Sequence, residues 1–385
     1  MNKKDLVTIF ILVATELIGF GLIIPILPQI SKQFSSSGLW IGCLLSSYSF
    51  AQFIAAPILG QLSDHYGRKP ILILSKLGTI ASYILLANAS TYFWLLASRL
   101  LDGFTGGNIA VARAYLSDIT DKEHRSKAMA IIGVAFGTGF IIGPAIGGIC
   151  YKLANNFSIA GYIGALLSFF SLLITQLALK EPSKKLKATP VQSTDSQAKL
   201  SGSSIIILCV SFIGMIIFSG FETSFSVYTE HKFGFNESQN SLMFFMIGIA
   251  AFIIQGSFTK ISISPIQKAI TIGLGAIGVG LILTNIIKAP IPSLASLGFL
   301  LFGISILNTH LPAELSSLSK QKGLILGTYE SVSSMARILG PLLIFTTLFK
   351  KLSIIYVVLG VFALISCVIF LFIQYMLDQN MSEKT

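Results

Sequence analysis

Acidic and basic side chains interrupt several long apolar stretches of this sequence, and they are the groups best able to do chemistry there. The acids within these stretches are Glu16, Asp102, Glu222 and Glu330. The cations within them are Lys76, Arg99, Arg113 and Arg337. An ionised side chain in hydrocarbon costs about 3 kcal/mol or more unless it faces a partner or a polar cavity. These few side chains are therefore the first candidates for a functional site.

Two pairs of opposite charge would share a helix face if these stretches are helical. Arg99 and Asp102 are three residues apart, and Glu330 and Arg337 are seven apart. Both spacings return to the same side of a helix. Arg113 follows Arg99 by fourteen residues and returns to nearly the same face. Such pairs can be static ion pairs that hold helices together or groups that exchange protons, and the spacing leaves both interpretations open.

Glu16 stands in an apolar stretch with no cation within two helical turns of it in the sequence. A carboxyl group in an apolar cavity can take up a proton near neutral pH, while a nearby arginine favours its ionised form. We therefore expect Glu16 and Asp102 to bind protons and substrate in competition, with Arg99 adjusting their affinity. The candidate set for proton coupling and substrate binding is Glu16, Arg99, Asp102, Glu222, Glu330 and Arg337.

The elements that position these groups follow from composition. The chain has 385 residues, 53% of them hydrophobic and only 11% charged, with a mean hydropathy of +0.80. Soluble domains contain about 25% charged residues. Apolar runs of about 20 residues can cross a bilayer as helices. The sequence thus predicts an all-α membrane protein, and it disfavours soluble enzymes, DNA-binding domains and secreted disulfide-rich domains.

We expect twelve transmembrane helices. The predicted spans are 6–28, 38–62, 71–89, 93–116, 127–150, 156–179, 204–228, 238–258, 268–287, 291–313, 324–349 and 353–377. With the N-terminus inside, cytoplasmic segments hold 17 of the 27 Lys and Arg residues, and external loops hold six. Cytoplasmic loops carry an excess of Lys and Arg. Both termini are therefore predicted to be cytoplasmic.

The chain divides near its middle. Residues 181–203 are rich in Lys, Ser, Thr and Gln, a flexible composition, and they separate residues 1–180 from residues 204–385. The pair Gly143-Pro144 recurs as Gly340-Pro341, and the Lys and Phe that follow the first span recur after the seventh at a similar offset. We expect two six-helix bundles joined by a cytoplasmic linker, which is the plan of transporters whose halves rock about a midplane site.

A polar loop between the second and third spans has a chemistry of its own. Residues 60–70 read GQLSDHYGRKP. The glycines permit a tight turn and close approach, the aspartate can accept hydrogen bonds from a helix N-terminus, and the arginine can form a charge-assisted pair. Asp118, in the equivalent loop after the fourth span, is the expected partner of Arg68. The predicted gating and switch residues are Gly60, Asp64, Gly67, Arg68, Lys69, Asp118, Gly143 and Pro144.

The fifth span contains glycines at helical spacing on either side of a proline, in residues 139–148. Gly139, Gly143, Gly147 and Gly148 line one face, which allows another helix to approach closely. Pro144 removes one backbone hydrogen bond and can bend the span. Helix packing and a gating role both account for this pattern.

Several of these motifs resemble one family. Residues 60–70 resemble the GxLxDxxGRK signature of the major facilitator superfamily, and residues 139–148 are similar to the glycine-proline motif of its proton-coupled antiporters. Residues 99–103 are similar to the RxxxG motif of that group. Residues 16–28 and 228–236 resemble parts of tetracycline efflux pumps, with Glu16 where those carry Asp. The resemblance implies the major facilitator fold, although the second half lacks a clear copy of the loop signature and Asp102 stands where a neutral polar residue is usual.

The resulting expectation is a secondary transporter, a proton-coupled antiporter that exports small amphiphilic compounds by alternating access. The alternative is a proton-linked transporter of a native metabolite such as a siderophore, sugar or organic acid. A transporter-like sensor and an intramembrane enzyme are the remaining classes, but the chain has no HExxH, GxSxG or P-loop motif. We expect no cofactor, no metal and no catalytic residue, with a proton gradient as the energy source.

The expected partners are a small-molecule substrate, protons and the lipid bilayer, and not nucleic acid. The expected state is a monomer in the cell membrane, in bacteria the inner membrane. Cys43, Cys150, Cys209 and Cys367 all fall within spans and form no CxxC pair, so we interpret them as packing residues.

Overall fold

The computed structural model describes residues 3–23, 38–154, 158–182, 201–235, 237–344 and 354–382. The helices are α1 (Lys3–Ile23), α3 (Gly38–Tyr66), α4 (Arg68–Ala87), α5 (Tyr92–Thr105), α6 (Asn108–Ile119), α7 (Arg125–Ala154), α8 (Ser158–Ala178), α9 (Gly202–Phe233), α10 (Glu237–Ser257), α11 (Ile266–Ile286), α12 (Pro290–Ser317), α13 (Lys322–Leu343) and α14 (Ile355–Ser382). A 3₁₀ turn, η1 (Lys122–His124), precedes α7. No strand occurs in these ranges.

Each predicted span overlaps a helix, with one difference in the fourth span. That span is divided into α5 and α6 by Gly106 and Gly107. Eight candidate spans in the described residues are long and apolar enough to cross a membrane. Parts of four predicted spans lie outside the described residues, namely residues 24–28, 156–157, 345–349 and 353. The Lys32 to Phe34 part of the repeat and residues 183–200 of the predicted linker also lie outside them.

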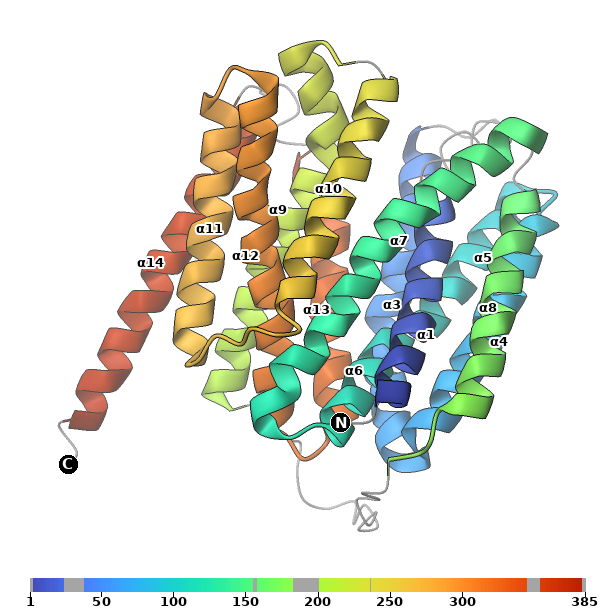
Figure 1. Cartoon of the computed structure of the whole chain (residues 1–385), viewed down its shortest axis with the longest axis horizontal. Coiled ribbons are helices and arrows are strands. Elements are labelled where there is room, and N and C mark those ends of the chain that lie inside the picture. The colour runs from blue at the N-terminus through green and yellow to red at the C-terminus, as the bar shows by residue number, and fades with distance from the viewer. Residues whose placement is uncertain are drawn as a thin grey trace.

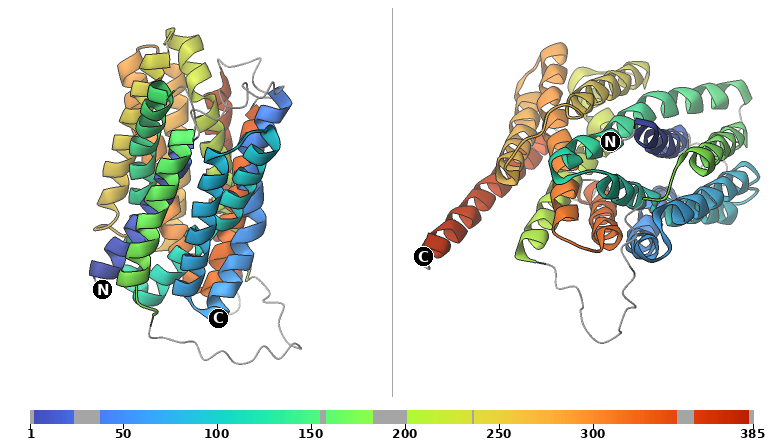
Figure 2. Two further views of the ribbon diagram at one scale, coloured as in Figure 1. Left: turned by 90° about the vertical axis from the view of Figure 1, so that its right-hand side faces the viewer. Right: turned by 60° about the horizontal axis from the view of Figure 1, so that its bottom comes forward.

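The helices before and after the middle of the chain stand on opposite sides of the molecule. Helices α1, α3, α4, α5 and α8 lie on one side and α9, α11, α12 and α14 on the other, while α7 runs obliquely between the two sides and packs against α10 (Figure 1). The two ends of the chain lie at the same end of the bundle as the α3–α4 turn (Figures 1 and 2). Two clusters of buried apolar side chains come only from residues before Lys180, and the largest comes mainly from α9 to α14.

The turn between α3 and α4 consists of one residue. Gly67 has φ +102°, a conformation that residues with a Cβ rarely adopt. The chain therefore reverses sharply after Tyr66, and α4 begins at once with Arg68. This turn holds the charged end of the predicted switch loop at the edge of the bundle.

The glycine-proline pairs occupy matching places in the two halves. A Cβ on Gly143 would approach the Gly21 Cα of α1 to 2.8 Å, and a Cβ on Gly340 would approach the Ile216 carbonyl oxygen of α9 to 3.0 Å. Each pair thus packs its helix, α7 or α13, against the first helix of its own half. This correspondence agrees with the offset found in the sequence.

Glycines also permit contact between the halves. A Cβ on Gly60 of α3 would collide with the carbonyl oxygen of Gly323 in α13, and a Cβ on Gly323 would collide with that of Gly60. One turn along, a Cβ on Gly327 would approach the Ala56 carbonyl oxygen to 2.5 Å. Helices α3 and α13 therefore touch backbone to backbone at the end where the switch loop lies.

Candidate functional site: two buried charge clusters and a loop latch

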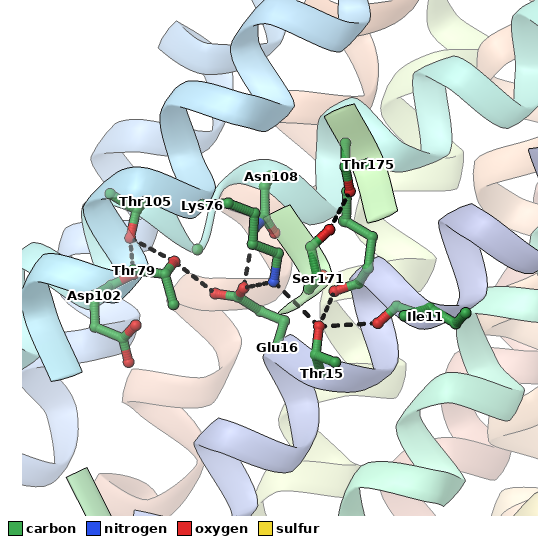
Figure 3. Close-up of polar contacts among 12 residues, drawn as sticks. Ile11, Thr15, Glu16, Lys76, Thr79, Asp102, Thr105, Asn108, Ser171 and Thr175 are labelled. Carbon is green, nitrogen blue, oxygen red and sulfur yellow. Dashed lines mark hydrogen bonds and ion pairs between the residues drawn. The ribbon is translucent and has the colours of Figure 1, made fainter. Parts of the chain in front are cut away.

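Glu16 has a buried cationic partner that the sequence analysis missed. The Lys76 Nζ of α4 lies 2.6 Å from the Glu16 Oε2 of α1, and the two side chains are 0% and 2% exposed (Figure 3). The Asn108 amide donates to the same carboxylate oxygen at 3.1 Å. The prediction that Glu16 stands alone is wrong, because it considered partners on the same helix whereas Lys76 reaches it from α4. Lys76 is an intramembrane charge in the sequence, but the predicted candidate set does not include it.

Asp102 pairs with Arg99, as their spacing predicts. The Arg99 Nη1 lies 3.1 Å from the Asp102 Oδ2, and the Ser82 hydroxyl donates to the Asp102 Oδ1 at 3.2 Å. Both charged side chains are buried. The Nε and Nη2 of Arg99 have no hydrogen-bond partner in the described part of the chain, while the guanidinium lies 5.7 Å from the ring centre of Tyr83.

Hydroxyl groups lie between these two ion pairs. The Thr79 hydroxyl is 3.4 Å from the Glu16 Oε1 and 3.1 Å from the Thr105 hydroxyl. Thr105 in turn contacts the Asp102 carbonyl oxygen at 3.1 Å. Thr79 and Thr105 thus link the Glu16 carboxylate to the backbone of Asp102, although no hydroxyl bridges the two carboxylates (Figure 3). We call Glu16, Lys76, Asp102 and Arg99 the N-half cluster.

A second cluster lies where the two halves meet. The Arg337 Nη2 is 3.2 Å from the Glu330 Oε1, so the predicted pair on α13 is present. Arg113 of α6 approaches the other oxygen of Glu330, with its Nε 3.7 Å from Oε2. We call Arg113, Glu330 and Arg337 the interface cluster.

Arg99 and Arg113 do not share a helix face, so that expectation from the sequence is wrong. Arg99 pairs with Asp102, whereas Arg113 contacts Glu330 and lies 5.0 Å from the ring centre of Tyr329 in α13. The interruption at Gly106 and Gly107 separates the two helical segments, so a continuous 14-residue helical count does not apply. The paired glycines were the sequence signal for this break.

Gln52 connects the interface cluster to that break and was not predicted. Its Oε1 accepts from the Arg337 Nη2 at 2.6 Å and from the Ser334 hydroxyl at 3.0 Å. Its Nε2 donates to the Gly106 carbonyl oxygen at 2.9 Å. The side chain is 1% exposed. The sequence signal for this contact is a polar glutamine within an apolar run, which carries no charge.

The switch loop forms the contacts expected of it. Arg68 lies 2.7 Å from Asp64 and 2.8 Å from Asp118, so the predicted Arg68–Asp118 pair is present. Asp64 accepts from the backbone N–H groups of Gly323 and Leu324 at 2.9 and 2.8 Å. These are the first residues of α13, where unpaired N–H groups favour a negative charge. The loop of one half therefore caps a helix of the other half.

A cation of the second half adds to this latch. The Lys322 Nζ lies 3.1 Å from Asp118 and donates to the Ser117 carbonyl oxygen at 2.9 Å. Burial lowers the pKa of Lys322, and the charge of Asp118 opposes that shift. Lys69 takes no part in these contacts, since its Nζ donates to the Gln176 carbonyl oxygen.

Glu181 fixes the other side of the loop. Its carboxylate accepts from the backbone N–H groups of Arg68 and Lys69 at 2.7 and 2.8 Å, and so caps α4. We call Asp64, Arg68, Asp118 and Lys322 the latch.

The remaining predicted residues occupy other places. Gly143 packs against α1, as do Gly139 and Gly147 on the same face of α7, and Pro144 lies inside α7. Glu222 lies on α9, is partly exposed, and makes no ion pair in the described ranges. It therefore belongs to neither cluster by direct contact.

The chain matches a known family of membrane proteins over most of its length. A family model described as Major Facilitator Superfamily matches residues 9–341. The chain belongs to the major facilitator superfamily. It is accordingly a membrane transporter of the multi-pass helical type, a class that is not enzymatic.

Relatives extend over most of the chain. The tetracycline resistance protein, class C, of Escherichia coli is 28% identical over 361 residues and covers 89% of each chain. Multidrug resistance protein 2 of Bacillus subtilis (strain 168) is also 28% identical, covering 87% of this chain and 88% of that protein. The crystal structure of the human organic anion transporter MFSD10 aligns with a TM-score of 0.82, at 24% identity over 96% of this chain and 99% of that one. The similarity to the MFSD10 structure shows the fold of this chain.

Proposed function

We propose that this protein is a proton-coupled antiporter that exports small amphiphilic compounds by alternating access. The proposal includes twelve transmembrane helices in two six-helix bundles, residues 1–180 and 204–385, joined by residues 181–203, with both termini in the cytoplasm. Relatives named for resistance to tetracycline and to multiple drugs support the substrate class. We further propose that it acts as a monomer in the cell membrane without a cofactor.

The observation that carries the proposal is the N-half cluster. Two carboxylates, Glu16 and Asp102, lie buried among hydroxyls near the middle of α1 and of the divided fourth span, and each has one cation beside it. Ionisable residues inside a membrane typically mark ion pathways or proton relays. Besides its cation, each carboxylate also has polar neighbours: Thr79 and Asn108 donate to Glu16, and Ser82 donates to Asp102.

The mechanism follows from the charges. When Asp102 takes a proton from the outer side, Arg99 loses its counter-charge, and the cluster then favours release of a bound compound. When the cytoplasmic side opens, the proton leaves and the Asp102–Arg99 pair forms again. Lys76 is in direct contact with Glu16, as Arg99 is with Asp102. We take Asp102 as the first carboxylate to test and Glu16 as the second.

In this proposal, the latch opens and closes one side of the transporter during alternating access. In the structure, Arg68, Asp64, Asp118 and Lys322 tie α3, α6 and α13 together at one end of the bundle. We assign this end to the cytoplasm, so the structure corresponds to a state closed on that side. Opening requires separation of Asp64 from the α13 N-terminus and of Asp118 from Lys322.

The experiment is a proton-gradient assay in everted membrane vesicles, with tetracycline and a panel of flat amphiphilic dyes and acids as test compounds. A compound that collapses the gradient only when the protein is present supports antiport. The Asp102→Asn variant should remove the response, whereas Asp121→Asn, which removes a loop carboxylate, should keep it. If no compound affects the gradient, or if Asp102→Asn responds like the unaltered protein, the proposal fails.

A further inference from the structure

The interface cluster has more positive than negative groups in direct contact. Arg113 and Arg337 both approach one carboxylate, that of Glu330. The exposed fractions of these side chains are 5% for Arg113, 18% for Arg337 and 2% for Glu330. One buried carboxylate therefore serves two guanidinium groups.

The hydrogen bonding of the cluster is also incomplete. The Nε and Nη1 of Arg113 and the Oε2 of Glu330 have no hydrogen-bond partner among the described residues. The distance of 3.7 Å between Nε and Oε2 is an ion pair but too long for a hydrogen bond. A buried donor without a partner costs about 1–3 kcal/mol, and more if it is charged. The cluster thus has donors ready for another acceptor.

Neutral groups beside the cluster favour an acceptor over a donor as the incoming group. The Gln52 Oε1 already accepts from Arg337 and Ser334, and its Nε2 is occupied by the Gly106 carbonyl oxygen. Tyr329 covers the face of Arg113. Both unsatisfied groups of Arg113 are donors, and the one unsatisfied acceptor of the cluster, the Glu330 Oε2, already faces Arg113 as an ion pair.

Glu222 is the other acidic side chain to consider near Arg337. Glu222 lies on α9, which packs against α13, and it is three residues from Ser219, whose hydroxyl contacts the Arg337 carbonyl oxygen at 3.5 Å. It makes no ion pair in the described ranges, so it does not neutralise either arginine by contact. Its charge would oppose an anion near Arg337 and is included in the test.

We propose that the interface cluster binds an anionic group of the transported compound, a carboxylate or an equivalent planar oxyanion, through Arg337 and Arg113, with Glu330 as the internal anion that it displaces. Guanidinium groups suit this role because their planar fork matches a carboxylate. Arg337 is the most exposed member and makes the first contact. This inference rests on the proposed transport function, since it names the chemistry of the compound carried.

If the anion displaces Glu330, removing the acidic charge and removing a basic charge should have opposite effects on anion affinity. Removing the Arg337 charge removes a binding group, so affinity for an anion falls. Removing the Glu330 charge removes the competitor, so affinity for an anion rises. A merely structural cluster would lose binding in both variants.

The test measures binding to purified protein by ligand-induced thermal stabilisation. The probes are flat aromatic compounds in three matched forms. These forms are naphthalene carboxylates, their primary amides and the corresponding naphthylmethylammonium ions. We expect carboxylates to bind about tenfold more tightly than the amides. Arg337→Gln should lower carboxylate affinity about tenfold, Arg337→Lys should restore part of it, and Glu330→Gln should raise it. Lys288→Gln, which removes an exposed loop cation, serves as the control for general charge effects.

Three outcomes would overturn the inference. They are amides or ammonium ions that bind as well as carboxylates, no stabilisation by any of the forms, or a Glu330→Gln variant in which carboxylate affinity falls. A gain of affinity in Glu330→Gln cannot come from misfolding. Glu222→Gln reports the opposing charge, since affinity for carboxylates should not fall in it. If carboxylates bind as expected but never collapse a proton gradient, the inference stands and the proposed antiport fails.

Discussion

The Lys76 Nζ and the Glu16 Oε2 are 2.6 Å apart in a pair that is almost wholly excluded from solvent. Breaking a buried ion pair by removing one partner leaves an uncompensated charge and costs about 3–5 kcal/mol. Replacing both partners by neutral groups removes that cost. The stability and the transport role of the pair can therefore be separated by experiment.

The first prediction concerns this pair. Glu16→Gln should lower the melting temperature of the detergent-purified protein because Lys76 loses its buried acidic partner. The double variant Glu16→Gln with Lys76→Met should melt close to the unaltered protein. Thermal unfolding followed by circular dichroism checks both. Equal melting of Glu16→Gln and the unaltered protein would show that the pair is not formed.

The second prediction concerns the latch. Arg68→Gln removes contacts to Asp64 and Asp118, charge-assisted bonds worth about 1.5–3 kcal/mol each. The end of the bundle that the latch closes should therefore open more often. Spin labels at positions 66 and 320, in a chain whose four cysteines are replaced, should report a larger population of long distances. Lys122→Gln is the matched loop control, and a distance distribution that Arg68→Gln leaves unaltered would refute the latch.

The third prediction concerns the backbone contact of α3 and α13. Gly60→Ala should destabilise the closed end by about 1–3 kcal/mol, because the new methyl group meets the Gly323 carbonyl oxygen. Gly298→Ala in α12 is the control, since a Cβ there has nothing within 4 Å. The same label pair measures the effect. If Gly60→Ala behaves as Gly298→Ala does, the two helices do not meet as described.

The fourth prediction concerns Gln52. Gln52→Leu would leave the Arg337 guanidinium and the Gly106 carbonyl oxygen each without one partner. We expect a loss of about 1–3 kcal/mol in stability and weaker transport, with Gln52→Glu retaining the contact to Arg337. Melting temperature and vesicle assays measure the two effects. A Gln52→Leu protein with normal stability would show that the bridge is dispensable.

Some contacts of the site could be predicted from the sequence because their geometry is local. Glu330 with Arg337 and Arg99 with Asp102 lie on single helices, where spacing alone decides which side chains meet. The Arg68–Asp118 pair joins two loops at the same end of the bundle, so topology was sufficient. The division of the chain into helices followed from the length of the apolar runs.

Other contacts depend on how helices pack, which spacing does not contain. Glu16 and Lys76 are 60 residues apart in sequence, and Arg113 meets Glu330 only because the halves touch along α6 and α13. The break at Gly106 and Gly107 also changes the direction of Arg113, so counting residues along one continuous helix gives the wrong face for it. Gln52 carries no charge, so the pattern of intramembrane charges does not single it out.

The most direct test of proton-coupled antiport is uptake by proteoliposomes that contain only the purified protein. An acidic lumen in alkaline medium should drive accumulation of tetracycline, a dye or an aromatic acid of the panel, and dissipating the pH gradient should stop it. The Asp102→Asn protein, reconstituted at the same density, should equilibrate the compound without accumulating it. Accumulation that is indifferent to the pH gradient, or no uptake of any compound, would contradict the account.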